Sequence, residues 1–202
     1  MSNSQQTVFV VDDDEALRDS ITWLLDSDNL NARMFCCVDD FLACGEQKKN
    51  GCLLLDIRMP GMSGMELLAQ LREKEIYLPV IMITGHGDVA MAVRAMKLGA
   101  FDFLAKPFNA HELLERVHAA LALSREERRQ RIAFEEKRSG VATLTGREME
   151  VFRLMVDGES SKEIAIKLGN SPKTVDIQRA SIMKKLNVRT LAEAVKLWFT
   201  VK

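Results

Sequence analysis

The first 122 residues alternate between short apolar runs and stretches in which apolar residues recur with a helical period. The apolar runs are the expected strands, at Val8–Val11, Cys52–Leu55, Pro79–Thr84 and Asp102–Ala105, with a weaker one near Ala32–Phe35. The stretch Val89–Leu98 is one of the expected helices. Continuous apolar runs separated by helices are typical of a parallel sheet buried on both faces. The pattern therefore predicts an α/β domain, a doubly wound sheet of five parallel strands with five helices.

Residues 143–202 contain helix-start signals instead of such runs. Three segments fit the capping box, in which a Ser or Thr is followed three residues later by Glu: Thr145–Glu148, Ser160–Glu163 and Thr190–Glu193. Ser171-Pro172 adds a fourth start, and Gly158 and Gly169 stand where the first two helices should stop. We predict a smaller all-α domain of four helices. In it, Lys162–Leu168, a short turn and Pro172–Leu186 form a helix-turn-helix.

A linker connects the two predicted domains. Ser124–Arg138 contains no Pro or Gly, so it can remain helical, and its apolar residues are too sparse for a coiled-coil seam. We therefore expect a solvated helical linker that ends at Ser139-Gly140. The predicted boundaries are 1–122 for the α/β domain, 123–142 for the linker and 143–202 for the helical domain.

Charge is divided unevenly between these parts. The whole chain has 28 Lys and Arg against 29 Asp and Glu, a net charge of −1 that by itself argues against a nucleic-acid partner. Residues 1–122 carry 11 basic against 18 acidic residues (net −7), residues 123–142 carry 6 against 4 (net +2), and residues 143–202 carry 11 against 7 (net +4). An acidic first domain and a basic second domain indicate two different kinds of partner.

Composition excludes several classes of protein. With 47% hydrophobic and 28% charged residues, the chain has ordinary globular composition, which excludes a disordered protein and a collagen-like or coiled-coil rod. No apolar run is long enough to span a bilayer and the polar start MSNSQQ is not a signal peptide, so we expect a cytoplasmic protein without a membrane partner. The four Cys lack zinc-type spacing and are expected to be reduced thiols, several of them filling core space.

Polar residues directly follow or end several of the expected strands. Asp12 and Asp13 follow the first strand, Asp56 follows the third, Thr84 ends the fourth, and Lys106 follows the fifth. In parallel sheets, functional groups collect just beyond the carboxyl ends of the strands. The three carboxylates would make an oxygen-rich site suited to Mg²⁺. Lys106 and the Thr84 hydroxyl could stabilise a phosphoryl group during its transfer to a carboxylate.

Each of these residues alone has an ordinary structural explanation. An Asp after a strand often caps the next helix, as we expect of Asp14, and a Lys-Pro pair is usually a surface turn. Their joint occurrence at four strand ends, in chain order, favours a site.

Residues 7–122 also resemble the receiver domain of two-component response regulators. The motifs that carry the resemblance are VVDDD (10–14), LLLDIRMPGMSGMEL (53–67), IMITGHGDV (81–89) and GAFDFLAKPF (99–108). The resemblance implies a flavodoxin-like fold, with Asp56 accepting a phosphoryl group from a histidine kinase. It implies a Mg²⁺ site made by Asp12, Asp13, Asp56 and the backbone carbonyl of Arg58.

The same resemblance assigns the switch residues. Thr84 is implied as the switch hydroxyl and Phe103 as the aromatic switch position. Lys106 is implied as the phosphate-binding lysine before a cis Pro107. The side chains of Arg58 and His86 are expected to flank the pocket.

The second helix of the predicted helix-turn-helix has one polar, basic face. Val175, Ile182 and Leu186 recur at helical spacing and should face the core. The residues that we expect to contact DNA lie on or beside the opposite face: Ser171, Lys173, Thr174, Asp176, Ile177, Arg179, Ala180 and Lys184. A basic face that is merely solvated is the alternative.

Residues 143–200 resemble the LuxR/NarL-type DNA-binding domain, through LTGREMEVF (144–152) and GESSKEIAIKLGNSPKTVDIQRASIMKKLNV (158–188). Together the two domains resemble the FixJ-like subgroup of response regulators. Gln178 stands where many relatives have His. Asp176 stands where some have Lys, and it could accept from a cytosine amino group or orient Arg179.

These patterns lead to one hypothesis about function. The chain is expected to be a transcription regulator in which phosphorylation of Asp56 changes a surface formed by Val89–Leu98, the fifth strand and the last receiver helix. The resemblance implies that this surface dimerises and places two recognition helices on promoter DNA. The expected partners are a sensor histidine kinase, double-stranded promoter DNA and a second copy of the chain, with RNA polymerase as a further candidate.

Two rival functions remain open at this level. One is a Mg²⁺-dependent phosphohydrolase that uses Asp56 or Asp12 as its nucleophile. It would need a substrate pocket or cap, and the connections around the acidic rim are short. The other is a DNA-binding protein whose receiver domain is inert.

Overall fold

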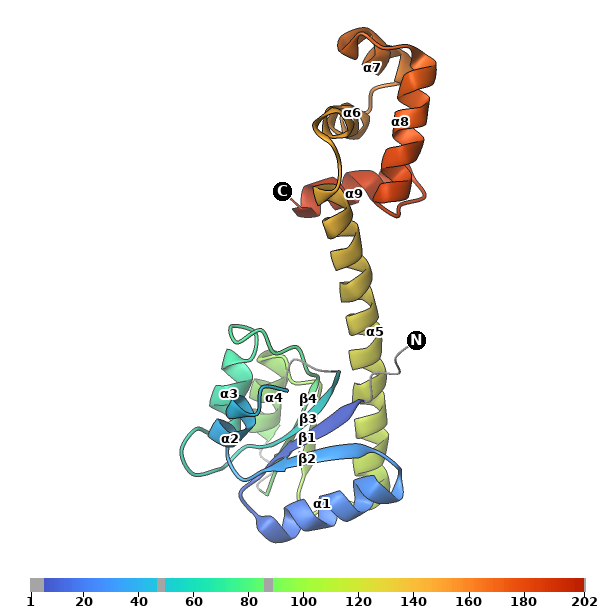
Figure 1. Ribbon diagram of the computed structural model, residues 1–202. Coiled ribbons are helices and arrows are strands. Elements are labelled where there is room, and N and C mark those ends of the chain that lie inside the picture. The colour runs from blue at the N-terminus through green and yellow to red at the C-terminus, as the bar shows by residue number, and fades with distance from the viewer. Residues whose placement is uncertain (1–5, 47–49, 86–88, 202) are drawn as a thin grey trace. The chain divides into compact units, whose positions relative to one another are not determined.

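The computed structural model describes residues 6–46, 50–85 and 89–201, and within these residues five parallel strands form one sheet (Figure 1). The strands lie in the order β2-β1-β3-β4-β5. Their bounds are β1 (Thr7–Val11), β2 (Asn31–Phe35), β3 (Gly51–Asp56), β4 (Val80–Thr84) and β5 (Asp102–Ala105). The fold predicted for this part of the chain is confirmed, including the weaker strand near Ala32–Phe35.

Helices cover both faces of this sheet because alternate side chains of each strand point to opposite sides. The first helices are α1 (Glu15–Ser27), α2 (Val38–Ala43), α3 (Gly64–Gln70), α4 (Val89–Lys97) and α5 (Ala110–Ala142). Val8 and Val10 belong to the core under α1 and α5. Phe9 and Val11 belong to the core under α2, α3 and α4. The sheet is therefore the middle layer of a three-layer domain.

Helix α5 is longer than predicted. Its first part packs on the sheet through buried residues such as Leu113 and Val117. Every residue from 125 to 139 is exposed or half-buried, which confirms a solvated helical connection. The predicted end at Ser139-Gly140 is wrong, because the helix continues to Ala142. Gly140 allows the backbone of α5 to lie close to the backbone of Lys185, since a Cβ atom on it would lie 2.6 Å from the carbonyl oxygen of Lys185.

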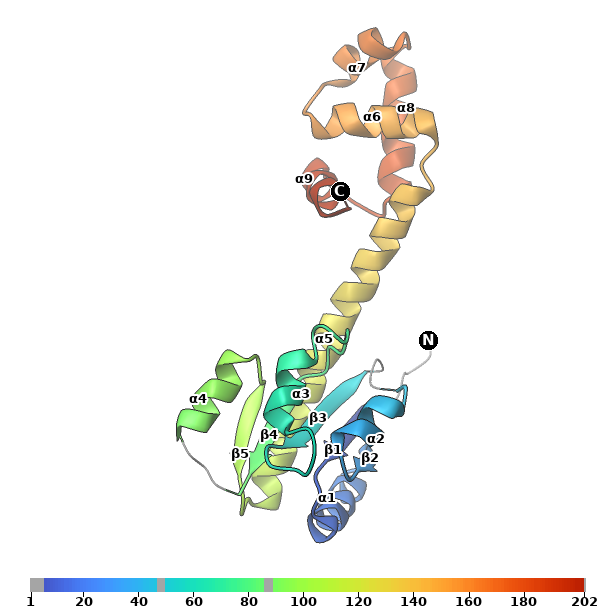
Figure 2. The same cartoon turned by 90° about the vertical axis from the view of Figure 1, so that its left-hand side faces the viewer.

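Four further helices follow in the described chain, as predicted: α6 (Gly146–Val156), α7 (Ser161–Leu168), α8 (Pro172–Lys185) and α9 (Leu191–Val201) (Figure 2). They enclose a core in which Phe152 packs edge-to-face on Trp198, with ring centroids 5.4 Å apart. The chain divides into two compact units, Met1–Arg128 and Arg129–Lys202.

The predicted helix starts are confirmed, and two of the three predicted capping boxes are complete. Thr145 and Ser160 form complete capping boxes with Glu148 and Glu163. The start of α9 differs from a capping box in one bond. The backbone N–H of Glu193 donates to Thr190 Oγ1, but the Glu193 carboxylate accepts from the backbone N–H of Arg189 instead of that of Thr190.

The four cysteines occupy different environments. Cys52 is buried in the core under α1 and α5, and Cys44 packs against the core on the opposite face of the sheet, so these two fill core space as predicted. Cys36 is exposed and Cys37 is half-buried, so Cys36 does not fill core space. Across the described residues, no helix has both the length and the apolar character needed to cross a membrane.

Candidate functional site

Four of the residues predicted for the acidic site lie at one edge of the sheet. Asp12 follows β1, Asp56 ends β3, Thr84 ends β4 and Lys106 follows β5. The register pairs Asp56 with Ile83 and Thr84 with Ala105, so these strand ends lie side by side. Asp12, Asp56 and Thr84 are each at most 5% exposed. The parallel topology has thus gathered residues that are up to 94 positions apart in the chain.

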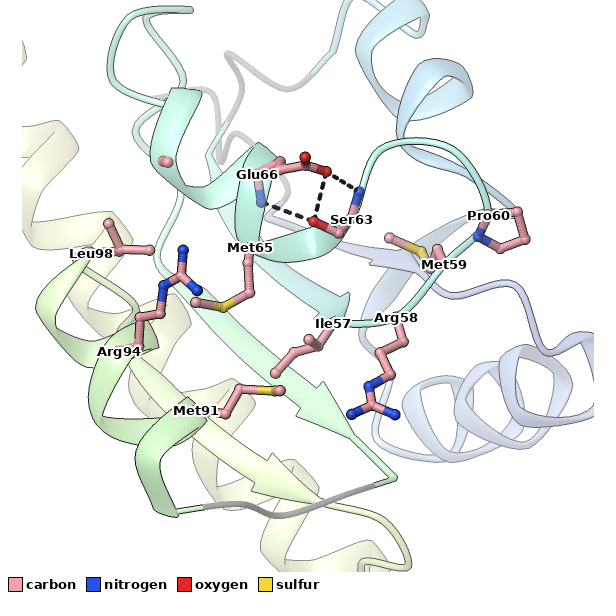
Figure 3. Close-up of a pocket in the computed structure, with 11 residues that line it drawn as sticks. Ile57, Arg58, Met59, Pro60, Ser63, Met65, Glu66, Met91, Arg94 and Leu98 are labelled. Atoms are coloured by element: carbon pink, nitrogen blue, oxygen red, sulfur yellow. Dashed lines mark hydrogen bonds between the residues drawn. The ribbon is translucent and has the colours of Figure 1, made fainter.

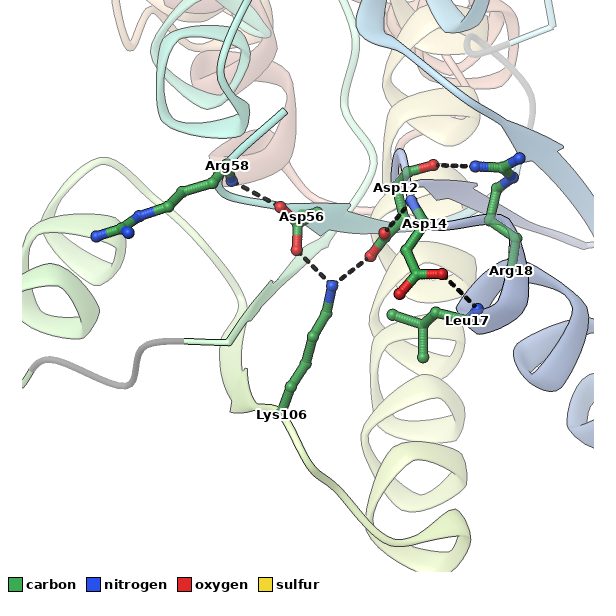
Figure 4. Close-up of polar contacts among 7 residues, drawn as sticks. All are labelled: Asp12, Asp14, Leu17, Arg18, Asp56, Arg58 and Lys106. Atoms are coloured by element: carbon green, nitrogen blue, oxygen red, sulfur yellow. Dashed lines mark hydrogen bonds and ion pairs between the residues drawn. The ribbon is translucent and has the colours of Figure 1, made fainter. Parts of the chain in front are cut away.

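Lys106 joins two of these carboxylates (Figure 4). Its Nζ lies 2.7 Å from Asp12 Oδ2 and 2.6 Å from Asp56 Oδ1. The backbone N–H of Lys106 donates to the Thr84 carbonyl at 2.6 Å, and the Lys106-Pro107 peptide bond is cis, as predicted. One ammonium group therefore holds both buried carboxylates.

The carboxylates have further donors on their other oxygens. Asp56 Oδ2 accepts from the backbone N–H of Arg58 at 2.6 Å. Asp12 Oδ1 accepts from the N–H of Asp14 at 3.0 Å, and Arg18 donates to the Asp12 carbonyl at 2.7 Å. These contacts orient both side chains, and Asp14 also caps α1, as predicted.

Burial raises the pKa of Asp56 above its usual value, because a charged carboxylate loses hydration at this position. The hydrogen bond and the charge of Lys106 oppose this rise without cancelling it, and the charge of Asp12 adds to it. Burial alone would lower the pKa of Lys106, but its hydrogen bonds to Asp12 and Asp56 outweigh burial and raise it. Lys106 therefore remains a cation at neutral pH.

The donors at this edge suit a hard cation. Asp12 and Asp56 offer carboxylate oxygens, Asp13 lies beside them with an exposed side chain, and the Arg58 carbonyl is adjacent in sequence. Oxygen-only donors with a raised carboxylate pKa fit Mg²⁺, which would offset the repulsion between the two buried acids. In the described part of the chain no contact joins Asp13 to Lys106, so the structure brings together Asp12, Asp56 and Lys106 and leaves Asp13 outside this network.

The remaining predicted receiver residues surround this network. Phe103 is half-buried on β5, where it pairs in register with Met82 and packs against the core. The Arg58 side chain points away from Asp56 (Figure 4) and lines a groove between the β3–α3 loop, α3 and α4 (Figure 3). His86 lies outside the described residues.

Sequence reasoning missed two residues that position the site. A Cβ atom on Gly64 would lie 2.0 Å from the Asp56 carbonyl oxygen, so only glycine lets α3 begin so close to Asp56. Arg18 reaches back from α1 to the Asp12 carbonyl. Gly64, at the start of a helix in the segment Met62–Met65, could have indicated a close backbone approach. No local pattern in the sequence pointed to Arg18.

The second candidate site is the exposed face of α8. Helix α7 ends at Gly169, which has a left-handed conformation, and Ser171 Oγ accepts from the N–H of Thr174 at 3.1 Å to start α8. Val175, Ile182 and Leu186 are fully buried, as predicted. Seven of the eight residues predicted to contact DNA are exposed: Ser171, Lys173, Thr174, Asp176, Ile177, Ala180 and Lys184.

Arg179 differs from the other residues predicted to contact DNA. It is half-buried, and its guanidinium donates to the Glu159 carbonyl at 3.1 Å. In the described chain no contact joins it to Asp176, so the structure does not support the idea that Asp176 orients Arg179. Its neighbour Gln178 is half-buried, and the Oε1 atom has no hydrogen-bond partner among the described residues.

Comparisons with known proteins agree with this architecture. Residues 8–118 match the family model of the response regulator receiver domain, and residues 142–198 match that of the bacterial regulatory proteins of the luxR family. The chain is 43% identical to the transcriptional regulatory protein FixJ of Azorhizobium caulinodans over 94% of its length and 90% of that protein. It is also 43% identical to the transcriptional regulatory protein TdiR of Thauera aromatica over 95% of its length and 85% of that protein.

Solved structures give the same result. The response regulator StyR is 43% identical, with a TM-score of 0.82 over 97% of this chain and 99% of that one. Full-length FixJ from B. japonicum is 36% identical, with a TM-score of 0.59 over 98% of both chains.

Proposed function

Because the chain belongs to the response regulators that join a receiver domain to a LuxR-type DNA-binding domain, we propose that phosphorylation of Asp56 by a histidine kinase controls its binding to promoter DNA. Its named relatives are transcriptional regulators, which disfavours the rival phosphohydrolase. Promoter DNA and the kinase phosphohistidine are both reached from the cytoplasm, and we infer that the protein acts there.

The observation that carries the proposal is the ion-pair network of Asp12, Asp56 and Lys106. The Arg58 N–H holds Asp56 Oδ2, and Lys106 holds Oδ1. An oxygen of Asp56 forms a bond to phosphorus as the bond from phosphorus to the kinase histidine breaks, and the leaving imidazole takes a proton. Lys106 then pairs with the new phosphoryl oxygens, where its charge stabilises the product.

Mg²⁺ would be held by Asp12, Asp13, Asp56 and the Arg58 carbonyl, and when bound it supplies positive charge to the phosphoryl oxygens. Asp12 is already oriented by its contacts to Asp14 and Arg18. Because Asp13 is exposed, its role is proposed from the resemblance and from its position beside Asp12.

We propose that the switch runs through β4 and β5. Thr84 is buried one strand away from Asp56, and Phe103 is half-buried at the far side of Thr84 on β5. A phosphoryl group adds at most about two negative charges, so the response has to act through a two-state element. Inward movement of Thr84 and rotation of Phe103 would be that element.

The surface beside this switch is apolar and exposed. On α4, Val89 is 77% exposed, Val93 48% and Met96 47%. Exposed apolar side chains of this kind are typical of an interaction surface. We propose that this face of α4, with β5 and the first part of α5, joins two phosphorylated chains and thereby presents two α8 helices to the half-sites of an inverted repeat.

One experiment tests the phosphorylation switch. The full chain and Asp56→Asn are treated with Mg²⁺ and beryllofluoride, a phosphoryl mimic, and are then compared by sedimentation and by promoter binding. We expect the wild type to dimerise and to bind DNA more tightly, and Asp56→Asn to respond in neither assay. Asp19→Asn, an exposed carboxylate on α1, is the matched control and should respond like the wild type.

Two outcomes would contradict the proposal. No change in the assembly or the DNA affinity of the wild type would indicate an inert receiver domain. Hydrolysis of assorted phosphate esters with multiple turnovers by the same preparation would instead support the rival function, a phosphohydrolase.

A further inference from the structure

The turn between β2 and α2 brings two cysteines and a carboxylate together. Cys36 directly follows β2, Cys37 is the N-cap of α2, and Asp40 lies in the first turn of that helix. One ligand atom from each residue lies within 4.8 Å of the other two. The Cys36 thiol donates to Asp40 Oδ2 at 3.1 Å.

We propose that Cys36, Cys37 and Asp40 form a binding site for a thiophilic divalent cation of the Zn²⁺ type, separate from the acidic site. Two thiolates and one carboxylate are common ligands of Zn²⁺, and a water molecule would complete a tetrahedral set. Each thiol loses its proton to solvent when its sulfur binds the metal.

The spacing of the three ligand atoms is close to what such an ion needs. A Zn–S bond of about 2.3 Å places the ligand atoms of a tetrahedral site about 3.8 Å apart. The three ligand atoms lie within 4.8 Å of one another, so none is more than about one ångström too far from another, and Cys36 Sγ already lies 3.1 Å from Asp40 Oδ2. Cys36 and Asp40 are exposed and Cys37 is half-buried, so small rotations of their side chains can close the gap without moving the core.

The chemistry of the ligands separates this site from the acidic site. Sulfur ligands select ions such as Zn²⁺ and Cd²⁺, whereas Mg²⁺ prefers oxygen. The two sites nevertheless occupy the same edge of the sheet, because the Phe35 carbonyl just before Cys36 accepts the N–H of Asp12 at 3.2 Å. A metal bound at the turn would therefore stiffen the segment next to Asp12.

The test is a titration of the reduced full chain with Cd²⁺, after treatment with a chelator and in excess Mg²⁺ to occupy the acidic site. Thiolate-to-metal charge-transfer absorption should saturate at one equivalent and should be displaced by Zn²⁺. We expect Cys36→Ser/Cys37→Ser to lose the absorption, and Asp40→Asn to bind at least about tenfold more weakly. Cys44→Ser and Asp39→Asn, which alter a cysteine and a carboxylate outside the cluster, should bind like the wild type.

A second measurement does not depend on any variant. In the wild type, Zn²⁺ should protect Cys36 and Cys37 from alkylation, as mapped by mass spectrometry, and should leave the labelling of Cys44 unchanged. The proposal is overturned if the absorption persists in Cys36→Ser/Cys37→Ser, if Asp40→Asn binds as tightly as the wild type, or if Zn²⁺ protects none of these thiols.

Discussion

Asp56 is a buried acid that ionises less readily in the folded domain than in the unfolded chain. Each of its oxygens has one donor, Lys106 Nζ or the Arg58 N–H. Burial nevertheless raises its pKa, so these two contacts do not fully replace the water that the carboxylate has lost. Ionisation of Asp56 therefore makes the folded receiver domain less stable than it would be with a protonated Asp56.

The pH dependence of stability follows from that shift. A pKa that is higher in the folded than in the unfolded state contributes stability below the unfolded value of about 3.9, and this stability is lost as pH rises through the folded pKa. Asp56→Asn removes the loss, so we expect it to stabilise the receiver domain at pH 7 by about 1 kcal/mol and to have little effect near pH 3. Hydrogen exchange of the β1 and β3 amides measures this. A variant less stable than the wild type at pH 7 would show that pairing with Lys106 outweighs burial.

Glu148 shows the opposite behaviour. Its hydrogen bond with Lys185 and its bonds with Thr145 lower its pKa to about 2. The stability that it contributes is complete above the usual Glu pKa of about 4.3 and is lost as pH falls from there toward 2. Because the pair is partly exposed, we expect Glu148→Gln to cost only about 1 kcal/mol at pH 7.

The measurement for Glu148 uses Trp198, which packs on Phe152 in the same core. In a Trp23→Phe background, which removes the other tryptophan, urea unfolding is followed by fluorescence at several pH values. Glu150→Gln, a more exposed carboxylate on α6, is the control. A cost of Glu148→Gln that does not shrink below pH 4 would contradict the assignment.

At the scale of elements, close backbone contacts decide which glycines matter. Gly64 allows α3 to begin beside Asp56, and Gly140 allows the end of α5 to lie against the end of α8. Neither glycine has a positive φ, so the space around it and not its backbone conformation explains it.

The substitution Gly140→Ala sets the higher helix propensity of alanine against a steric clash with α8. Alanine is about 1 kcal/mol better than glycine inside an isolated helix. Its Cβ atom would lie 2.6 Å from the Lys185 carbonyl oxygen, which is backbone and cannot rotate away. We expect the clash to dominate, with a net loss of about 1–3 kcal/mol in the unfolding of the C-terminal unit. Ser139→Ala, an exposed neighbour on α5, should be nearly neutral, and a stabilised Gly140→Ala would show that the contact is looser than described.

The exposed basic face of α8 leads to a prediction about salt. Lys173→Ala and Lys184→Ala should each weaken promoter binding and lower the slope of log affinity against log salt by about one. Binding isotherms at several salt concentrations measure this. Lys74→Ala removes the same charge from an exposed position after α3 and should change neither quantity. An unchanged slope for both α8 variants would exclude phosphate contacts at these positions.

At the scale of the whole molecule, α5 belongs to both units. The C-terminal core includes Val141, which is 8% exposed, and the half-buried Phe134 packs against that core. The proposed boundary at residue 143 would remove both side chains from the DNA-binding domain. A continuous helix has therefore contributed to two cores, one at each of its ends.

Two fragments test this directly. Residues 129–202 retain Phe134 and Val141, and residues 143–202 lack them. We expect the longer fragment to be more stable by about 2–3 kcal/mol, because the apolar area that Phe134 and Val141 bury together is about that of one fully buried side chain. Trp198 is the one tryptophan in either fragment, so urea unfolding by fluorescence compares them. Equal stability would place the boundary at residue 143.

By itself, the sequence determined the elements and the chemistry that they carry. Apolar runs, capping boxes and residues at strand ends are local patterns. The interactions that they encode join residues close in the sequence, and the folded chain keeps them. They predicted the five-stranded sheet, the four C-terminal helices and the joint position of Asp12, Asp56 and Lys106.

Only the tertiary structure decided what depends on distant neighbours. Gly140 reads as a helix end in the sequence, but the close approach of Lys185 makes it a contact. Arg179 reads as a DNA contact, yet it is held by the Glu159 carbonyl. Cys36, Cys37 and Asp40 carry no zinc-type spacing, and the turn after β2 gathers them. Each outcome depends on a partner or a backbone path that local propensity does not encode.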